Sequence, residues 1–495
     1  MKELTMMRSN ETTRRFRAGA MLVMAAGLFA ANPVAPATAA TPARSWKDVK
    51  ITPLEWKKPE PTTIKLRNGV TVYLMEDHRL PLISFYGTVR TGALYDPPGK
   101  AGTAGLMGNL LRTGGTAKRP WDQVDAEVDR LAMSVSTGVG NESGNASFQV
   151  LTENFQPALN LLFEMLREPA FDAEKLALAK EKIKDGIRRQ NDNPVQIALR
   201  ELPRRLYGTD HPRGFAPTFA TVDAITRQDL VDFHKKYYVP SNFLIGVAGD
   251  FDPKTIAATI EAAMGSWPDA TVELPSVPPV PMNTPRAIFQ ADKTSATQST
   301  ILISRLGTKV GDPDAAALEV MDFILGSGGF TSRVVEAVRS DEGLAYASGS
   351  ALQLGNLDPG PEIVYAISKG ESTVKALEIM LREIGRMRDE PVTKAELSRA
   401  TNGLLNAEVF NYDQPDKVLA SVLDLAYYGL PQDLPTKRLE ALAKVSAEDV
   451  QAMARKYLPD DQLQILVVGA AANFDKPLSS IGPVTTIELK DPTAP

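Results

Sequence analysis

The feature that most constrains this chain is an internal duplication, because landmarks of its first half return in the same order in its second half. The repeats lie 219 to 222 residues apart, so the spacing between them drifts by only a few residues. A supersecondary unit that recurs with so little drift predicts two copies of one fold. The echoed segments are 165–169 with 387–391, 207–208 with 428–429, 226–229 with 446–449, 238–240 with 457–459, and 243–249 with 463–469.

Each copy mixes strand-like and helix-like hydrophobic patterns, which predicts an α+β unit. Two of the expected helices have recognisable starts: Asn154 is expected to cap one, and Thr226 and Asp229 form a capping-box pattern at the start of another. The first copy predicts strands at 66–74, 83–91, 134–138, 145–151 and 243–248, and helices at 102–112, 121–133, 154–167, 174–189 and 226–237.

A proline-rich segment separates the two copies. Residues 268–285 contain six prolines, which predicts a stiff extended linker. This linker divides the chain into an N-terminal domain at 63–267 and a C-terminal domain at 286–480. An N-terminal arm at 41–62 and a tail at 481–495 lie outside the two domains.

The first forty residues have the pattern of a secretory signal peptide. Five basic residues precede an apolar stretch at 18–31, and Ala37-Thr38-Ala39 offers a cleavage site of small residues. We therefore expect cleavage near residue 40 and a periplasmic product. Arg14-Arg15 leaves the twin-arginine route open beside general export. With no cysteine, the chain forms no disulfide and carries no lipid on a cysteine.

The charge of the chain argues against nucleic acid as a partner. It holds 55 Lys and Arg against 60 Asp and Glu, a formal charge of −5. Removal of residues 1–40, with five basic and two acidic residues, leaves −8. A polyanion would require the opposite sign. Beyond residue 40 no apolar run approaches the about 20 residues that span a bilayer, so no membrane span is expected.

The segment 326–346 holds the two polar groups with the best claim to a function. A glycine-rich turn precedes a short helix, which Gly343 is expected to end as a left-handed cap, and a strand follows. Arg339 and Tyr346 lie seven residues apart on either side of this cap, where both side chains can converge. The alternative interpretation is a surface arginine at a helix end beside a half-buried strand tyrosine.

This segment resembles the C-terminal domain of the pitrilysin–insulinase family of zinc peptidases. The shared motifs are the Gly-Gly-x-x-Ser-Arg turn at 328–333, the Arg–Tyr pair, Leu-x-Asn-Gly at 66–69 and Tyr-Tyr-x-Pro-x-Asn at 237–242. The resemblance covers about residues 60–480. It implies two homologous repeats, each a mostly antiparallel sheet with helices packed on one face. Mitochondrial processing peptidase and the core subunits of the respiratory bc complex are similar in this respect.

Active members of that family carry a zinc motif that is missing here. His-x-x-Glu-His places two imidazoles and a general base on one helical face, and a further Glu follows 77 residues later. The matching positions are Gly105, Gly108, Asn109 and Gly186, none of which is a zinc ligand. The three histidines, His78, His211 and His234, are too dispersed for a local ligand pattern. We therefore expect no metal or other cofactor in this chain.

The resemblance then implies a zinc-free subunit of a two-chain peptidase. Its partner would be a homologous chain with His-x-x-Glu-His and zinc, and its substrates would be peptides. Arg339 and Tyr346 would bind the scissile carbonyl and stabilise the oxyanion in the partner's site, next to a substrate loop with Gly328, Gly329 and Ser332. The alternative is a catalytically dead structural or peptide-binding relative. An independent enzyme has no support in the sequence.

Overall fold

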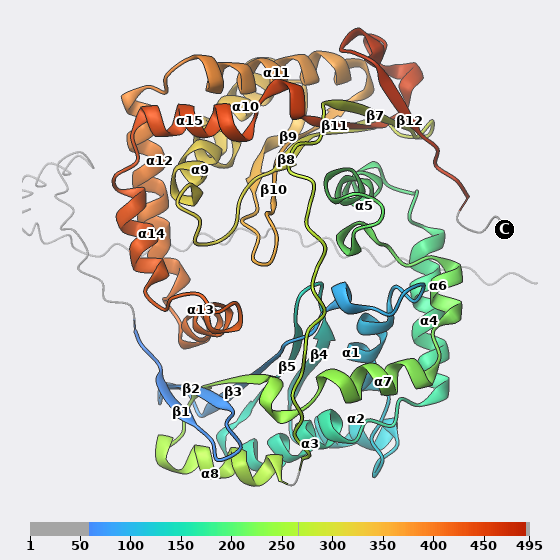
Figure 1. Ribbon diagram of the computed structural model, residues 1–495, viewed down its shortest axis with the longest axis vertical. Helices are drawn as coiled ribbons and strands as arrows, with labels where there is room; N and C mark the ends of the chain where they lie inside the picture. Colours follow the sequence, from blue (N-terminus) through green and yellow to red (C-terminus); the bar gives the residue numbers. More distant parts are fainter. Residues whose placement is uncertain (1–58, 266, 492–495) are drawn as a thin grey trace, which may run out of the picture. The chain divides into compact units, whose positions relative to one another are not determined.

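The computed structural model describes residues 59–265 and 267–491, and the chain forms two six-stranded sheets over this part (Figure 1). The predicted signal peptide and most of the predicted arm lie outside the described residues. The first sheet contains β1 (Thr62–Lys65), β2 (Thr71–Glu76), β3 (Leu82–Val89), β4 (Ser134–Val139), β5 (Gly144–Leu151) and β6 (Phe243–Gly249). The second contains β7 (Ala287–Asp292), β8 (Gln298–Leu306), β9 (Ala345–Leu352), β10 (Pro361–Lys369), β11 (Gln464–Gly469) and β12 (Val484–Ile487).

The two sheets share one topology, which confirms the predicted duplication. Their strand orders are β1-β2-β6-β3-β5-β4 and β12-β7-β11-β8-β10-β9. In both sheets the long central strands pair antiparallel, and a parallel pair lies next to them, β2 with β6 in the first sheet and β7 with β11 in the second. The sixth strand differs, because β1 precedes its sheet in the chain whereas β12 follows the last helix and runs parallel to β7.

Helices supply the remaining mass of the two halves. In the N-terminal half they are α1 (Thr103–Thr113), α2 (Trp121–Arg130), α3 (Phe155–Arg167), α4 (Ala173–Arg188), α5 (Pro194–Tyr207), α6 (Phe219–Ala224), α7 (Arg227–Tyr237) and α8 (Pro253–Met264). In the C-terminal half they are α9 (Ala315–Asp322), α10 (Arg333–Val335), α11 (Thr373–Asp389), α12 (Lys394–Ala407), α13 (Pro415–Tyr427), α14 (Leu434–Leu442) and α15 (Ala447–Tyr457). None of the helices among the described residues is long and apolar enough to cross a membrane.

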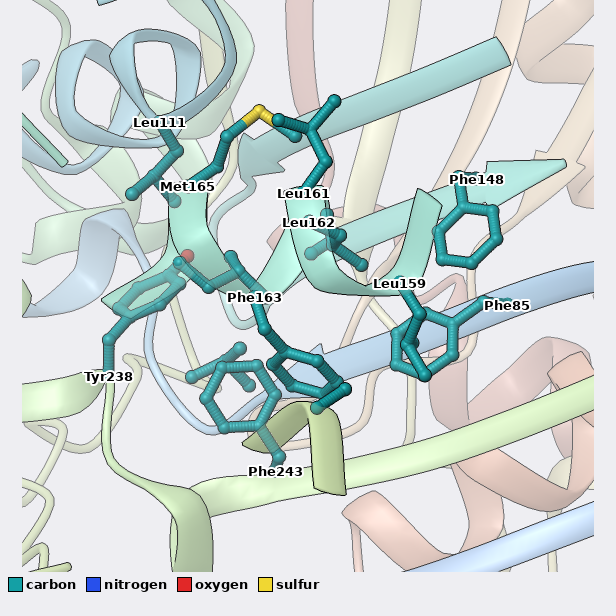
Figure 2. Close-up of a cluster of buried hydrophobic side chains, with 14 of the residues drawn as sticks. Phe85, Leu111, Phe148, Leu159, Leu161, Leu162, Phe163, Met165, Tyr238 and Phe243 are labelled. Carbon is teal, nitrogen blue, oxygen red and sulfur yellow. The ribbon is translucent and has the colours of Figure 1, made fainter. Parts of the chain in front are cut away.

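One face of each sheet carries the main hydrophobic core. In the N-terminal half the ring of Phe85 stacks on that of Phe148 with 5.4 Å between centroids, and Phe163 of α3 meets Phe85 edge-on at 5.9 Å (Figure 2). The corresponding core of the other half joins α9 and α11 to the inward residues of β8, β10 and β11. The predicted α+β class, two repeats of sheet and helices, is therefore confirmed.

The second face of each sheet is covered in part by a helix from the other half. Helix α5 packs on β8 and β11, where Ile197, Leu202 and Leu206 join Leu302 and Leu466 in one buried cluster. Helix α13 packs on β2 and β6 in the same way. Because a fully buried leucine stabilises a fold by roughly 1.5–3 kcal/mol, each sheet depends on a helix of the opposite half. The two halves are thus expected to fold as one unit.

A buried ionic cluster closes the contact between the halves. Arg213 pairs with Glu142 in the β4–β5 turn and donates to Asp358 in the β9–β10 connection at 2.7 Å. Tyr207 and Tyr428, which occupy equivalent positions in the two repeats, each donate a hydrogen bond to the turn of the other half. Tyr207 at the end of α5 donates to the carbonyl of Pro359 at 3.2 Å, and Tyr428 after α13 donates to Glu142 at 2.8 Å.

The structure corrects several local expectations. Asn154 precedes α3 but does not cap it, because its amide donates to the carbonyl of Leu131 at 3.2 Å. Thr226 does form the predicted capping box with Asp229. Helices α5 and α8 have no counterpart among the predicted elements. The predicted tail contains β12, so the C-terminal sheet extends to Ile487. The described part of the predicted linker contains neither helix nor strand.

Candidate functional site

The positions that match the zinc motif lie on two helices in contact. Gly105, Gly108 and Asn109 belong to α1, and Gly186 belongs to α4, which packs beside it. Asn109 is exposed and its side chain accepts from the hydroxyl of Thr113 at 3.3 Å. Over the described residues, no group of three His, Cys, Asp or Glu is placed to hold a metal ion. The donor set therefore does not fit the zinc that active relatives carry.

The packing of α1 shows that one of these positions has also lost its space. A Cβ added at Gly108 would lie 2.6 Å from the main-chain nitrogen of Val139 and 2.7 Å from the carbonyl carbon of Gly138, on β4. Such distances leave no room for any side chain. A Cβ at Gly105 or at Gly186 would meet nothing within 4 Å. The predicted general-base position, Gly108, thus leaves no room for a side chain, whereas two of the predicted ligand positions, Gly105 and Gly186, have room for one.

Each of the three histidines contacts other groups of the chain. His234 donates from Nε2 to the carbonyl of Leu166 at 2.7 Å, and burial lowers its pKa to about 4. His211 accepts from the amide of Arg213 at Nδ1 and lies 2.9 Å from the carbonyl of Pro278. His78 lies on the surface between Asp250 and Glu76, which raise its pKa.

The predicted substrate loop is braced by its own serine. Ser332 is buried, and its hydroxyl contacts the carbonyls of Gly329 at 2.6 Å and Gly326 at 3.1 Å. Gly329 adopts φ 71°, a left-handed conformation that suits glycine. A Cβ at Gly328 would lie 2.5 Å from the carbonyl oxygen of Phe323. Within this loop Ser332 and the glycines therefore fix the path of the backbone.

Arg339 is placed by an irregular helix. After α10 the chain continues as a π-helical turn, Glu336–Asp341, and the amide of Leu344 donates to the carbonyl of Val338 at 3.0 Å. Gly343 follows with φ 62°, which confirms the predicted left-handed cap. π-Helical turns hold one extra residue and are frequent at functional sites. The predicted short helix is therefore present, but most of it is π-helical.

Tyr346 is placed by an irregular strand. The register between β9 and β10 shifts here, because Ala345 opposes Ser368 while Ala347 opposes Ile367. Tyr346 is the residue left over between them, so it occupies a β-bulge. Bulges re-aim side chains and are over-represented next to active sites. Tyr346 consequently leaves the sheet, and its side chain is 81% exposed.

The structure brings Arg339 and Tyr346 together and adds a third residue. The guanidinium carbon of Arg339 lies 5.6 Å from the ring centroid of Tyr346 and 4.7 Å from that of Phe330. Phe330 is 67% exposed on the substrate loop. Both distances lie within the range of cation–π attraction. Phe330 was not singled out from the sequence, although an aromatic residue inside a glycine-rich turn was a signal for it.

Both polar groups keep their hydrogen-bonding capacity. Across the described part of the chain, no carboxylate pairs with Arg339, and no hydrogen bond engages the hydroxyl of Tyr346. The rings hold the guanidinium without neutralising its charge, since a π-face is not an anion. The arrangement therefore presents a cationic donor and a hydroxyl donor side by side at the surface.

Comparisons with known proteins identify the family that this chain resembles. Residues 84–214 match the family model of insulinase (peptidase family M16), and residues 224–404 match that of the peptidase M16 inactive domain. An uncharacterized zinc protease of Rickettsia bellii is 25% identical over 338 residues, 68% of this chain and 80% of that protein. A probable mitochondrial-processing peptidase subunit beta of Arabidopsis thaliana is 22% identical over 423 residues, 83% of this chain and 78% of its own.

The fold itself also has a solved counterpart. The crystal structure of a peptidase M16 inactive domain from Pseudomonas fluorescens superposes with a TM-score of 0.75. The alignment covers 83% of this chain and 98% of that one, at 24% sequence identity.

Proposed function

Since the chain belongs to the M16 family of peptidases, we propose that it is the zinc-free subunit of a two-chain peptidase. Its partner would be a homologous chain that carries His-x-x-Glu-His and binds the zinc ion. Arg339 and Tyr346 would act in the partner's site on a peptide substrate. One matched relative is named as a subunit of a processing peptidase, which supports an assembly of this kind.

The observation that carries this proposal is the state of the Arg339–Tyr346 pair. A residue kept only for stability is normally buried or satisfied, but this hydroxyl is exposed and without a partner among the described residues. Two backbone irregularities, the π-helical turn and the β-bulge, are needed to place the pair. Irregularities of this kind cost local stability and persist where they position functional groups.

The chemistry of the pair suits a developing oxyanion. When water attacks a peptide carbonyl, negative charge moves onto the carbonyl oxygen, and preorganised donors stabilise it. The guanidinium of Arg339 offers N–H groups with a fixed positive charge, and Tyr346 offers an O–H donor. Phe330 and Tyr346 hold the guanidinium in place before substrate arrives. The partner would supply the zinc-bound water and the base.

We also propose that the chain is exported to the periplasm. The support is the basic start, the apolar stretch at 18–31 and Ala37-Thr38-Ala39. Intact-mass analysis of the protein from its native source should find an N-terminus near residue 40. An intact Met1 on the mature protein would contradict this.

The second candidate is a catalytically dead structural or peptide-binding relative. Among the described residues no group could hold a metal ion, which is compatible with this candidate as it is with the first. The matched description "inactive domain" is also compatible with it. The two candidates differ in one respect, because only the first requires the donors Arg339 and Tyr346 in another chain's site.

Reconstitution with a partner tests the proposed function. The chain should co-purify with a homologous His-x-x-Glu-His protein, for which an adjacent reading frame is the first place to search. Peptide hydrolysis should appear in the mixture and be absent from this chain alone. A partner that hydrolyses peptides equally well without this chain would refute the proposal. So would stoichiometric zinc and chelator-sensitive activity in this chain alone.

A further inference from the structure

A buried acid lies inside the C-terminal core. Glu362 is 0% exposed at the start of β10, and its side chain lies on the same face as Val364 and Ala366, which belong to the apolar core. No donor reaches either carboxylate oxygen of Glu362. An ionised carboxylate without donors or a cation is among the costliest groups to bury. The environment of this side chain therefore requires an explanation.

A second acid, Asp322 at the end of α9, lies beside Glu362, because it accepts from Ser350 of β9, which opposes Val364, the next residue of β10 on the same face as Glu362. Arg305 lies opposite Glu362 on β8, but its guanidinium turns away and donates to Gln462 at 2.8 Å. From β9, Ser350 presents a hydroxyl, which donates to the Asp322 carboxylate. Burial and the negative charge of Asp322 both raise the pKa of Glu362 well above its ordinary value of 4.5. Among the described residues, no titratable group other than Asp322 shifts the pKa of Glu362.

We propose that Asp322 and Glu362 share one proton, and that this carboxyl pair is a positioning device for the Arg339–Tyr346 segment. Glu362 keeps the proton and donates it to Asp322, which accepts from Ser350 at the same time. The proton thereby joins α9, β9 and β10 at one point. The catalytic consequence of this inference depends on the proposed function, but the proton sharing does not.

The pair is linked to the site through the backbone next to it. Directly after Asp322 the chain forms a π-helical turn, Phe323–Ser327, and a Cβ at Gly326 would lie 2.5 Å from the carbonyl carbon of Gly349 on β9. The carbonyl of Gly326 accepts from Ser332, which braces the substrate loop. Tyr346 lies four residues before Ser350 on the same strand. Loss of the shared proton should therefore loosen the loop and the bulge together.

The direction of the pH effect follows from linkage. Below pH 4.5 the side chain is protonated in both folded and unfolded chains and has no effect on stability. As the pH rises, the unfolded chain loses this proton while the folded chain keeps it, so stability falls. The unfolding equilibrium constant should rise by up to about tenfold per pH unit from this one group. The fall ends once the pH passes the folded pKa.

The test compares the wild type with Glu362→Gln in the purified chain without any partner. The amide donates to Asp322 without a shared proton, so the stability of the variant should lose this pH dependence. Relative to the variant, the unfolding equilibrium constant of the wild type should rise by up to about tenfold per pH unit as the pH increases above about 5, until the folded pKa is passed. Amide hydrogen exchange at residues 326–332 and in β9 measures local opening. In the wild type the exchange rate should increase with pH more than the intrinsic rate does, whereas in the variant it should follow the intrinsic rate.

Asp322→Asn is a second, independent test of the shared proton. An amide at either position can donate a hydrogen bond to the remaining carboxylate, so no shared proton is needed. Glu383→Gln is the matched control, since Glu383 is equally buried but pairs with Arg382 and Arg386. Glu383→Gln should destabilise the chain at neutral pH, and the stability of this variant should still fall as the pH rises, as in the wild type. Parallel pH profiles for wild type and both amide variants would overturn the proposal. Failure of both variants to fold at pH 5 would also overturn it. A failed peptidase assay would leave these results unaffected.

Discussion

Helix α1, which follows β3, and the segment from α9 to Ser327, which follows β8 and leads to Arg339, occupy comparable places in the two halves, but they differ in what comes after them. In both halves a helix follows the second strand of the repeat and presses a glycine onto an edge strand. Gly108 meets Gly138 and Val139 on β4, and Gly326 meets Gly349 and Ser350 on β9. Beyond this contact, α1 continues as a regular helix to Thr113, whereas the other segment ends as a π-helical turn at Ser327 and leads through the substrate loop to a second π-helical turn with Arg339.

The difference teaches that packing and chemistry are retained separately. The N-terminal half preserves its sheet, core and helix–strand contact although all positions of the zinc motif lack ligands. The C-terminal half accepts an irregular helix, a bulge and exposed aromatic rings. Among the described helices, the π-helical turns thus lie in the half for which a function is proposed, whereas α1 is regular.

The largest expected effect concerns the hydroxyl of Tyr346. In a reconstituted complex, Tyr346→Phe removes one donor to the oxyanion and keeps the ring that contacts Arg339. Loss of one such donor costs about 100- to 1,000-fold in kcat, or roughly 3–4 kcal/mol of transition-state stabilisation. Steady-state kinetics on the mixed complex measures this. Arg339→Ala should in addition raise KM, because its charge also faces the carbonyl of bound substrate.

Tyr365→Phe is the matched control for that experiment. Tyr365 lies on β10 of the same sheet, so the same change of one hydroxyl tests the general effect of the substitution. Its kcat should stay near wild type. If Tyr346→Phe also turns over peptide at the wild-type rate, the pair has no catalytic role and the structural candidate is favoured.

A second prediction concerns the response of the N-terminal half to acid, through its buried His234. The pKa of His234 is lowered from 6.5 to about 4, so the folded chain binds this proton less readily than the unfolded chain. Stability from this group is complete above pH 6.5 and falls as the pH drops toward 4. The loss amounts to about 3 kcal/mol. Denaturant titrations between pH 7 and 4 measure the free energy of unfolding. The wild type should lose this additional stability as the pH falls, and His234→Gln should not. Equal slopes would refute the assignment to His234.

Much of the fold was predictable from the sequence because it depends on local patterns that occur twice. The echoes at 226–229 and 446–449 are both capping boxes in the structure. The packing of α5 and α13, each on the sheet of the other half, was not predictable in this way. Ile197, Leu202 and Leu206 form an apolar stripe on α5, but a stripe does not state which sheet it covers. That choice depends on the other half of the chain.

The candidate site was predictable in part for a related reason. The seven-residue spacing of Arg339 and Tyr346 across a glycine cap indicated their approach, which the structure shows. The β-bulge at Tyr346 and the π-helical turn depend on pairing with β10 and packing on β9, so no local signal marks them. The filled position at Gly108 depends on a backbone contact with β4, which only three-dimensional packing reveals.

The third prediction uses two glycines of one helix to sharpen the contrast within α1. Gly108→Ala should destabilise the chain by about 1–3 kcal/mol, since the added methyl group overlaps the backbone of β4. Gly105→Ala should instead stabilise it by about 0.5–1 kcal/mol, because its Cβ meets nothing within 4 Å and alanine is the better helix former. Gly105 and Gly108 lie three residues apart in the same helix, so the gain in helix propensity from alanine is the same at both positions. Chemical denaturation of the two variants measures the difference. If both alanines stabilise the chain, the contact between α1 and β4 is looser than described, and the general-base position could again hold a side chain.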